Sequence, residues 1–211
     1  MRKMIKRLHL GSGRLEKLTV AAANTFLNKD WINLGDLELR NPNNRPLIEV
    51  DYSKINYQPF FYKLGDSLPF KDETFTFIFS EHFFEHLFFE HALGLFKECY
   101  RVMQQGGIIR IVVPDADLRP VPEMIGFPSP LIGYDQPEKH KNRWSIYNLR
   151  PALELSGFRV SPIKYYDLHG VLTDTTENID LKYYNGSPDA FLITDFSYIK
   201  RKNSLIVDGI K

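Results

Sequence analysis

The feature that most constrains the fold is a pair of strand-like runs separated by one helical stretch. Residues 74–80 read TFTFIFS and residues 108–113 read IIRIVV, and both compositions are typical of buried strands. Between them, apolar residues recur at near-helical spacing over residues 85–104, and Gly106-Gly107 offers a left-handed helix stop. Because parallel strands need a crossover connection, this segment predicts a parallel strand–helix–strand unit.

The same alternation continues through most of the chain and predicts a single domain over residues 1–211. We expect a doubly wound, Rossmann-like α/β fold with a mostly parallel sheet of about seven strands and an antiparallel edge strand. The last two strands have no clear helix between them, so we expect them to pair antiparallel. Besides the two runs above, the candidate strands are residues 5–10, 31–34 (favoured over 47–50 as the second strand), 59–64, 158–166 and 204–210, and the other candidate helices are residues 15–27 and 144–156.

Charge and composition exclude several classes of partner. The chain has 27 Lys and Arg against 26 Asp and Glu, a formal net charge of +1, so no general field attracts it to nucleic acid or to an anionic membrane. It holds no apolar run of the roughly 18 residues that a membrane span needs. The lone Cys99 cannot form an internal disulfide, which favours a reducing compartment. We expect a cytoplasmic protein that acts on a small molecule, and its oligomeric state stays open.

The first strand runs into the turn Gly11-Ser12-Gly13, and ligands of doubly wound sheets bind at such carboxyl ends of strands. Glycines let the chain turn sharply and let a ligand approach the backbone, although an ordinary strand-to-helix turn has the same residues. A dinucleotide-binding turn would have a third glycine where Glu16 stands, which disfavours NAD. An acidic residue some 20 positions later can bind a ribose. Asp36 is favoured for this role, and Asp51 is the alternative.

Three segments resemble successive signatures of class I S-adenosylmethionine (SAM)-dependent methyltransferases. They are LHLGSG at residues 8–13, GDSLPFKDETFTFIFSEHFFEHL at residues 65–87 and ECYRVMQQGGIIRIVVPD at residues 98–115. The chain is most similar to a bacterial subgroup of predicted methyltransferases that opens with LHLGSG and ends near SLIVDGIK, here residues 204–211. It departs from many relatives at Leu15, where they have a third glycine, and at Gln105, where they have proline.

The resemblance implies SAM as the cofactor and assigns a role to each part of the site. The turn would line the methionine part of the cofactor, an acid would bind the ribose, a loop would hold the adenine, and the end of the central strand would lie under the sulfonium and face the acceptor. In that order, the residues are Leu10, Gly11, Ser12 and Gly13; Asp36; Asp66, Ser67 and Leu68; and Ser80, Glu81 and His82.

Methyl transfer to a hydroxyl needs an aligned acceptor and a base whose pKa lies near neutrality. Histidine has such a pKa, so His82 and His140 are the candidate bases, with Glu81 or Asp115 able to orient a histidine. The Pro- and Gly-rich residues 117–143 predict a lid over a polar small molecule. We expect an O- or N-methyltransferase for an acceptor such as a sugar or glycan precursor. The alternative is a catalytically inactive cofactor-binding module of the same fold.

A second alternative rests on His82-Phe-Phe-Glu85-His86, which matches the H-x-x-E-H pattern of inverted zinc metallopeptidases. In those enzymes two histidines four positions apart on a helix bind zinc, and the glutamate activates water. Here the pattern follows a strand end instead of lying inside a predicted helix. We therefore expect no bound zinc, and we interpret His86 and His91 as surface or packing histidines.

Overall fold

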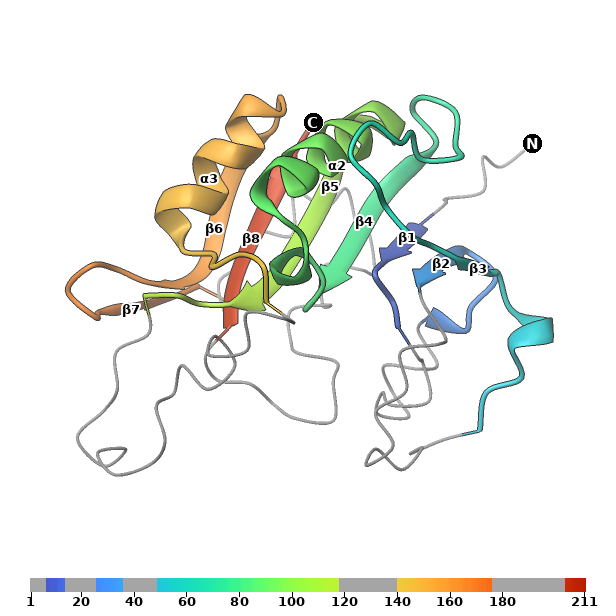
Figure 1. Cartoon of the computed structure of the whole chain (residues 1–211), viewed down its shortest axis with the longest axis horizontal. Helices are drawn as coiled ribbons and strands as arrows, with labels where there is room; N and C mark the ends of the chain where they lie inside the picture. The colour runs from blue at the N-terminus through green and yellow to red at the C-terminus, as the bar shows by residue number, and fades with distance from the viewer. Residues whose placement is uncertain (1–6, 14–25, 36–48, 118–139, 176–203) are drawn as a thin grey trace.

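One sheet of eight strands runs through the part of the chain that the computed structural model describes, residues 7–13, 26–35, 49–117, 140–175 and 204–211 (Figure 1). Its strand order is β3-β2-β1-β4-β5-β8-β6-β7. The strands are β1 (Arg7–Leu10), β2 (Trp31–Gly35), β3 (Tyr57–Pro59), β4 (Phe75–Glu81), β5 (Met103–Pro114), β6 (Arg159–Tyr166), β7 (Leu172–Asp174) and β8 (Ser204–Ile210).

The strand directions confirm the predicted doubly wound α/β class and add detail to it. Strands β3, β2, β1, β4 and β5 pair in parallel, whereas β8 is antiparallel to both β5 and β6. The reversed strand β8 therefore lies inside the sheet, and the antiparallel edge strand is the short β7. Six of the seven residues of β8 are buried, which suits a strand with neighbours on both sides. The expected antiparallel pairing of the last two long strands is confirmed.

A buried ion pair fixes the register between β5 and β8. Arg110 and Asp208 are directly opposite each other, and the guanidinium donates from Nε and Nη2 to the two carboxylate oxygens at 2.7 Å each. Both side chains are almost fully buried. Because separating these two groups would leave a charge without its counterion in the interior, a slip of β8 along β5 is strongly disfavoured.

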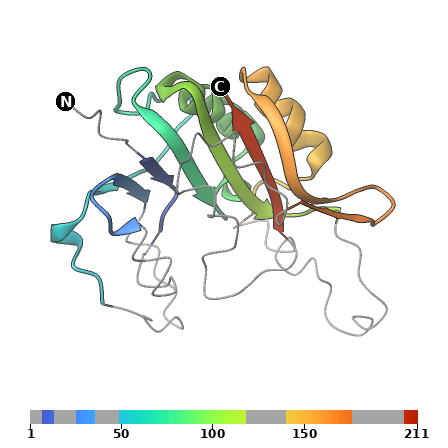
Figure 2. The same ribbon diagram turned by 180° about the vertical axis from the view of Figure 1, so that it is seen from behind.

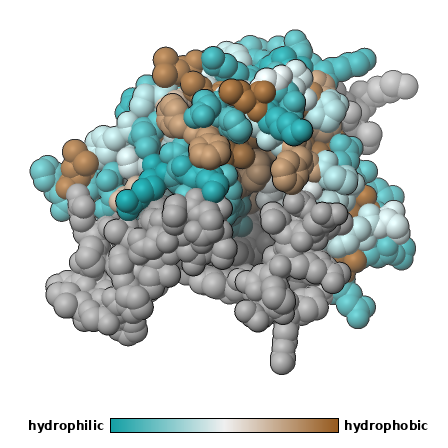
Figure 3. Space-filling model, viewed as in Figure 1, coloured by the Kyte–Doolittle hydropathy of each residue, from teal (hydrophilic) through white to brown (hydrophobic). Residues whose placement is uncertain are grey.

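Two helices cover one face of the sheet, as the views from the front and from behind show (Figures 1 and 2). They are α2 (Phe89–Val102) and α3 (Ile146–Leu155), and two short 3-10 helices, η2 (Tyr52–Lys54) and η3 (Phe84–His86), complete the described helical structure. The outer surface of this face is mostly hydrophilic with scattered apolar patches (Figure 3). No helix in the described residues is long and apolar enough to cross a membrane.

The predicted helix over residues 85–104 is divided in two and ends earlier than expected. Leu87 and Phe88 have extended backbone, which separates η3 from α2. The helix stops at Met103, also extended, and the chain enters β5 at once. Gly106 does adopt a left-handed conformation, with φ +74°, but it lies within β5 and not at a helix end. The glycine pair instead continues the pairing of β5 with the chain after β8: the Gly106 N–H donates to the Lys211 carbonyl at 2.9 Å, and the Lys211 N–H donates to the Gly107 carbonyl at 3.0 Å.

The structure confirms residues 31–34 as the second strand, β2, and places residues 49 and 50 outside any strand. The predicted strand over residues 59–64 is wrong: β3 ends at Pro59, and residues 60–64 are not in a strand. Residues 144–156 do contain a helix, α3, which Ser145 and Asn148 begin with a reciprocal capping box. Residues 15–25 of the helix predicted over residues 15–27, and most of the predicted lid, lie outside the described residues.

Candidate functional site

The carboxyl ends of β1 and β4 meet at the centre of the sheet. These strands are parallel, and Leu10 of β1 is paired with Ser80 of β4. The turn that starts at Gly11 is therefore adjacent to the segment that starts at Glu81. The structure therefore brings the predicted methionine-binding turn next to the predicted acceptor-facing end of β4. In doubly wound sheets, ligands bind at these carboxyl ends of the strands.

Close packing on both sides explains the glycines of the first turn and of β2. A Cβ on Gly11 would overlap the ring of Phe83, and its φ of +72° also favours glycine. A Cβ on Gly35 would lie 2.5 Å from the hydroxyl oxygens of Ser12 and Tyr57, and 2.7 Å from the Gly13 nitrogen. The turn, β2 and β3 are therefore in direct contact.

The hydroxyl of Tyr57 anchors the turn by donating a hydrogen bond to the carbonyl oxygen of Gly13 at 2.9 Å. The sequence interpretation included neither Tyr57 nor Gly35 in the site. The sequence did offer one signal for including Gly35 in the site, because Gly35 directly precedes Asp36, the predicted ribose-binding acid. Asp36 itself lies outside the described residues.

Two buried hydroxyls in the site lack a hydrogen-bond partner among the described residues. They are Ser12 Oγ in the turn and Ser80 Oγ at the end of β4. A buried polar group without a partner costs free energy, so such atoms are typical of places where a ligand or water binds. Beside Gly13, where φ is +50°, no described heavy atom lies within 4 Å of the position of a Cβ. The turn therefore suits a polar ligand that approaches its backbone.

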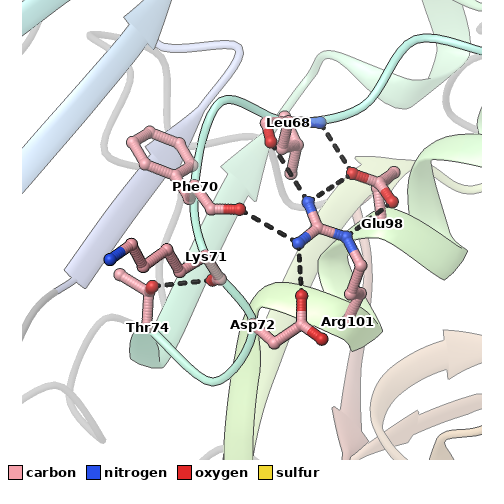
Figure 4. Close-up of polar contacts among 7 residues, drawn as sticks. All are labelled: Leu68, Phe70, Lys71, Asp72, Thr74, Glu98 and Arg101. Atoms are coloured by element: carbon pink, nitrogen blue, oxygen red, sulfur yellow. Dashed lines mark hydrogen bonds and ion pairs between the residues drawn. The ribbon is translucent and has the colours of Figure 1, made fainter.

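The predicted adenine loop, residues 66–68, is fixed to helix α2 by a charged network (Figure 4). The Leu68 N–H donates to Glu98 Oε2 at 2.6 Å, and the Leu68 carbonyl accepts from Arg101 Nη2 at 3.1 Å. Arg101 also binds Glu98 through two nitrogens, at 2.8 and 2.7 Å, and Asp72 at 2.6 Å. Both backbone polar groups of Leu68 are thus engaged within the protein, and its side chain lies in the core.

Asp66 and Ser67, in contrast, are exposed. Asp66 Oδ2 accepts a hydrogen bond from the backbone N–H of Lys63 at 2.9 Å, and the Asp66 N–H donates to the Lys63 carbonyl at 3.0 Å. These two bonds form a tight turn that presents the carboxylate at the surface. The network around Arg101 therefore determines where this turn sits, and Asp66 has room to bind a second group.

Asp51, the alternative ribose acid, has a local structural role. It accepts hydrogen bonds from the N–H and the hydroxyl of Ser53 at 3.1 and 2.5 Å, and it pairs with Lys54 at 2.7 Å. The bonds from Lys54 and Ser53 lower the pKa of Asp51 to about 2. This carboxylate caps η2 in the exposed loop before β3.

His82 follows β4 directly and is paired with Glu85. Its backbone is left-handed, with φ +49°, and its N–H donates to the Val112 carbonyl of β5 at 2.8 Å. The ring nitrogen Nδ1 lies 3.1 Å from Glu85 Oε1. Burial of the Glu85 carboxyl opposes ionisation, but the hydrogen bond from His82 and the nearby charges of His82 and His86 outweigh it and lower the pKa of Glu85. A carboxylate paired in this way orients the imidazole.

His140 lies at the same cluster. The backbone N–H groups of Lys141 and Asn142 donate to the Glu85 carbonyl at 2.8 and 3.1 Å, and the His140 ring is 4.9 Å from that of His86. Both predicted bases therefore adjoin Glu85. The sequence interpretation had offered Glu81 or Asp115 to orient a histidine. Asp115 instead accepts hydrogen bonds from the N–H groups of Asp117 and Tyr166, so it joins the ends of β5 and β6.

Comparison with known proteins places this geometry in a known fold. Residues 44–111 match the family model described as "Methyltransferase domain". The chain is similar to a SAM-dependent methyltransferase from Archaeoglobus fulgidus, with 20% identity, a TM-score of 0.55 and coverage of 99% of this chain and 87% of that one. It is also similar to the YcgJ protein of Bacillus subtilis, with 16% identity, a TM-score of 0.56 and coverage of 100% and 93%. The chain has the class I methyltransferase fold. No curated protein sequence matches it.

The part that matches the methyltransferase model contains most of the site just described. It includes the loop at residues 66–68, all of β4, the His82–Glu85 pair and helix α2, and it ends within β5. The glycine turn precedes it in the chain and joins it through the pairing of β1 with β4.

The methyltransferase fold also separates the residues of the zinc-peptidase pattern. His82 lies before η3 in left-handed conformation, and His86 ends this 3-10 helix. The two histidines are therefore not one turn apart on an α-helix, which is the arrangement that the inverted peptidases use. Nothing in the comparisons supports a peptidase.

Proposed function

We propose that this protein is a SAM-dependent methyltransferase. The observation that carries the proposal is the contact between the glycine turn after β1 and the end of β4, which lies within the segment matched by the methyltransferase model. Bound SAM supplies a methyl group that its sulfonium has already activated for displacement. The protein has to hold the cofactor, align the acceptor and accept a proton where the acceptor carries one.

We assign cofactor binding to the turn, the end of β4 and the loop at residues 66–68. No described atom lies close to the position of a Cβ on Gly13, and the buried hydroxyls of Ser12 and Ser80 have no hydrogen-bond partner among the described residues. At the adenine end of the proposed cofactor site, Asp66 is exposed and suits the exocyclic amine of the adenine, with Ser67 beside it. Leu68 contributes by holding this loop against α2. Leu10, Glu81 and Asp36 complete the proposed binding set.

We assign the role of base to His82. Its Nδ1 faces the Glu85 carboxylate, whose pKa is lowered. We therefore assign the hydrogen to Nδ1, which donates a hydrogen bond to Glu85. The basic lone pair is then on Nε2, which can take a proton from a hydroxyl or amine acceptor. His140 is the second candidate, because it adjoins the same glutamate.

The proposed acceptor is a polar small molecule, such as a sugar or glycan precursor, methylated on oxygen or nitrogen. Its support is the presence of polar side chains, with Glu81 and His82 at the end of β4 and His140 beside Glu85, and the net charge of +1. We further propose that the chain forms a single domain and that residues 117–143 act as its lid.

A screen for S-adenosylhomocysteine (SAH) release over metabolite pools tests the activity. Wild-type protein is expected to turn over at least one pool, and His82→Ala is expected to reduce the rate about 100-fold or more. His169→Ala, in the exposed turn between β6 and β7, is the matched control and should retain the rate. Tight cofactor binding without turnover in any pool would instead favour the inactive binding module.

A further inference from the structure

Three side chains next to the proposed base bring potential metal ligands together. Ligand atoms of Glu85, His86 and His140 all lie within 4.8 Å of one another. Glu85 and His86 belong to η3, whereas His140 comes from a distant part of the chain and precedes the segment that leads into α3. The sequence pattern had pointed to a different pair, His82 and His86, and from the sequence we expected no bound zinc there.

The backbone holds these residues in place without any ion. The Glu85 carbonyl accepts two hydrogen bonds, from the N–H groups of Lys141 and Asn142, at 2.8 and 3.1 Å. His140 is therefore fixed next to η3 by its two following residues. The rings of His86 and His140 meet edge to face, with an interplanar angle of 76°.

The Glu85 carboxylate has an oxygen to offer. Oε1 is engaged with His82 Nδ1, and it also lies 4.0 Å from His86 Nε2. Oε2 is buried and has no hydrogen-bond partner among the described residues, while the side chain as a whole is only 1% exposed. A buried carboxylate oxygen without a partner is costly unless a cation or donor meets it.

We propose that Glu85, His86 and His140 form a binding site for a divalent first-row transition-metal ion of the Zn²⁺ type. Two imidazoles and one carboxylate are a ligand set that such ions prefer, whereas Mg²⁺ and Ca²⁺ prefer all-oxygen sites. Ligand atoms around a tetrahedral zinc ion lie about 3.4 Å apart, so the cluster has to contract slightly. The His86 side chain is 43% exposed and can rotate to do so.

In this arrangement His82 is not a ligand. It donates to the glutamate that binds the metal, and such outer contacts orient the ligands of metal sites. Three protein ligands leave a coordination position open, as in catalytic metal sites. The proposal goes beyond the methyltransferase function and does not rest on it, because the binding can be measured without cofactor or acceptor.

Calorimetric titration of chelator-treated, tag-free protein with Zn²⁺ tests the proposal, with Mg²⁺ as the comparison ion. Wild type is expected to bind Zn²⁺ at one site and to gain thermal stability, and Mg²⁺ should give neither effect. His86→Ala and His140→Ala should each weaken Zn²⁺ binding by about tenfold or more. Neither side chain is fully buried, so both variants are expected to fold, which circular dichroism verifies.

His169→Ala is the matched control, since it removes an exposed histidine from the turn between β6 and β7. It should bind Zn²⁺ as tightly as wild type. The proposal is overturned if wild type binds no Zn²⁺, or if His169→Ala weakens binding as much as the other two substitutions do. If wild type binds no Zn²⁺, SAH binding and turnover are still expected. The metal-site proposal can therefore fail without the methyltransferase proposal failing.

Discussion

His82 Nδ1 lies 3.1 Å from Glu85 Oε1, and the glutamate is almost completely buried. With the proton on Nδ1, as proposed above, Nε2 is the basic nitrogen of the imidazole. Asp115, which the sequence suggested for this role, is used elsewhere. The His82–Glu85 pair therefore holds the proposed base directly after the end of β4.

Replacing Glu85 by glutamine should remove the preference for one tautomer of His82 while the side chain keeps its size. We expect Glu85→Gln to lower kcat by about 10- to 100-fold with little change in the affinity for SAH. Steady-state kinetics with a chelator present, together with SAH titration, measure both quantities without a contribution from bound metal. An unchanged kcat would show that Glu85 does not orient the base.

The charged network in Figure 4 should be a measurable source of stability. Arg101→Met removes hydrogen bonds to Glu98, Leu68 and Phe70 and should lower the free energy of unfolding by about 1–3 kcal/mol. It should also weaken SAH binding, because the loop at residues 66–68 loses its anchor.

Arg150→Met is the matched control for this substitution. Among the described residues, Arg150 pairs with Glu154 alone, one turn further along α3, in an exposed 2.9 Å contact. Exposed pairs of this kind contribute about 0.5 kcal/mol or less. Urea unfolding of both variants makes the comparison, and equal losses of stability would refute a special role for Arg101.

The packing predicts that Gly35→Ala is more damaging than Gly13→Ala. A methyl group on Gly35 would meet a backbone nitrogen at 2.7 Å as well as two hydroxyl oxygens, so Gly35→Ala should displace the turn and abolish SAH binding. Gly13→Ala meets no described atom within 4 Å, so in the protein without ligand it should cost about 1 kcal/mol of stability through its positive φ. If Gly13→Ala proved the more damaging to thermal stability, this account of the turn would be wrong.

Stability should fall in acid through His9, which is completely buried in β1. Burial lowers the pKa of His9 to about 3, against the weaker opposing effect of its hydrogen bond with Asn33. Between the unfolded pKa near 6.5 and the folded value, the unfolded chain binds a proton that the folded chain does not.

The group therefore destabilises the fold as pH falls through this window, by about 1.4 kcal/mol for each pH unit. Above the unfolded pKa its effect is absent. His9→Gln retains an amide that can meet Asn33 and removes the titration. Urea unfolding measured at several pH values should thus show a smaller acid loss for His9→Gln than for wild type, and parallel curves would contradict the prediction.

The long strands could be predicted from local composition, whereas the short strand β3 and the order of the strands in the sheet could not. Strands β4 and β5 are long and mostly apolar because their side chains are buried in two separate core clusters, and this pattern is visible in the sequence. The edge strand β3 has three residues and carries almost no pattern, which is why the prediction was displaced toward residues 60–64. The position of β8 inside the sheet depends on its pairing with β5 as well as with β6. The absence of a helix between β6 and β8 indicated their pairing, but no local signal indicated the pairing of β8 with β5.

The same distinction applies to the candidate site. The glycine turn and the end of β4 are contiguous motifs, and the sequence located both. The anchor of the proposed adenine loop joins residues 33 positions apart, Leu68 and Arg101, through a backbone carbonyl that no side-chain pattern reveals. His140 was predicted as a base by its residue type alone. Only the fold shows that it adjoins Glu85 and His86.

Calorimetric titration with SAH tests the central claim most directly. Wild type is expected to bind SAH at one site, and Asp66→Ala should weaken binding by about 1–3 kcal/mol through the loss of a hydrogen bond. Asp167→Ala removes a comparable turn carboxylate, which accepts from the N–H groups of His169 and Val171, and should leave the affinity unchanged. Absence of both binding heat and a thermal shift for wild type at roughly millimolar SAH, far above typical cofactor dissociation constants, would contradict the account.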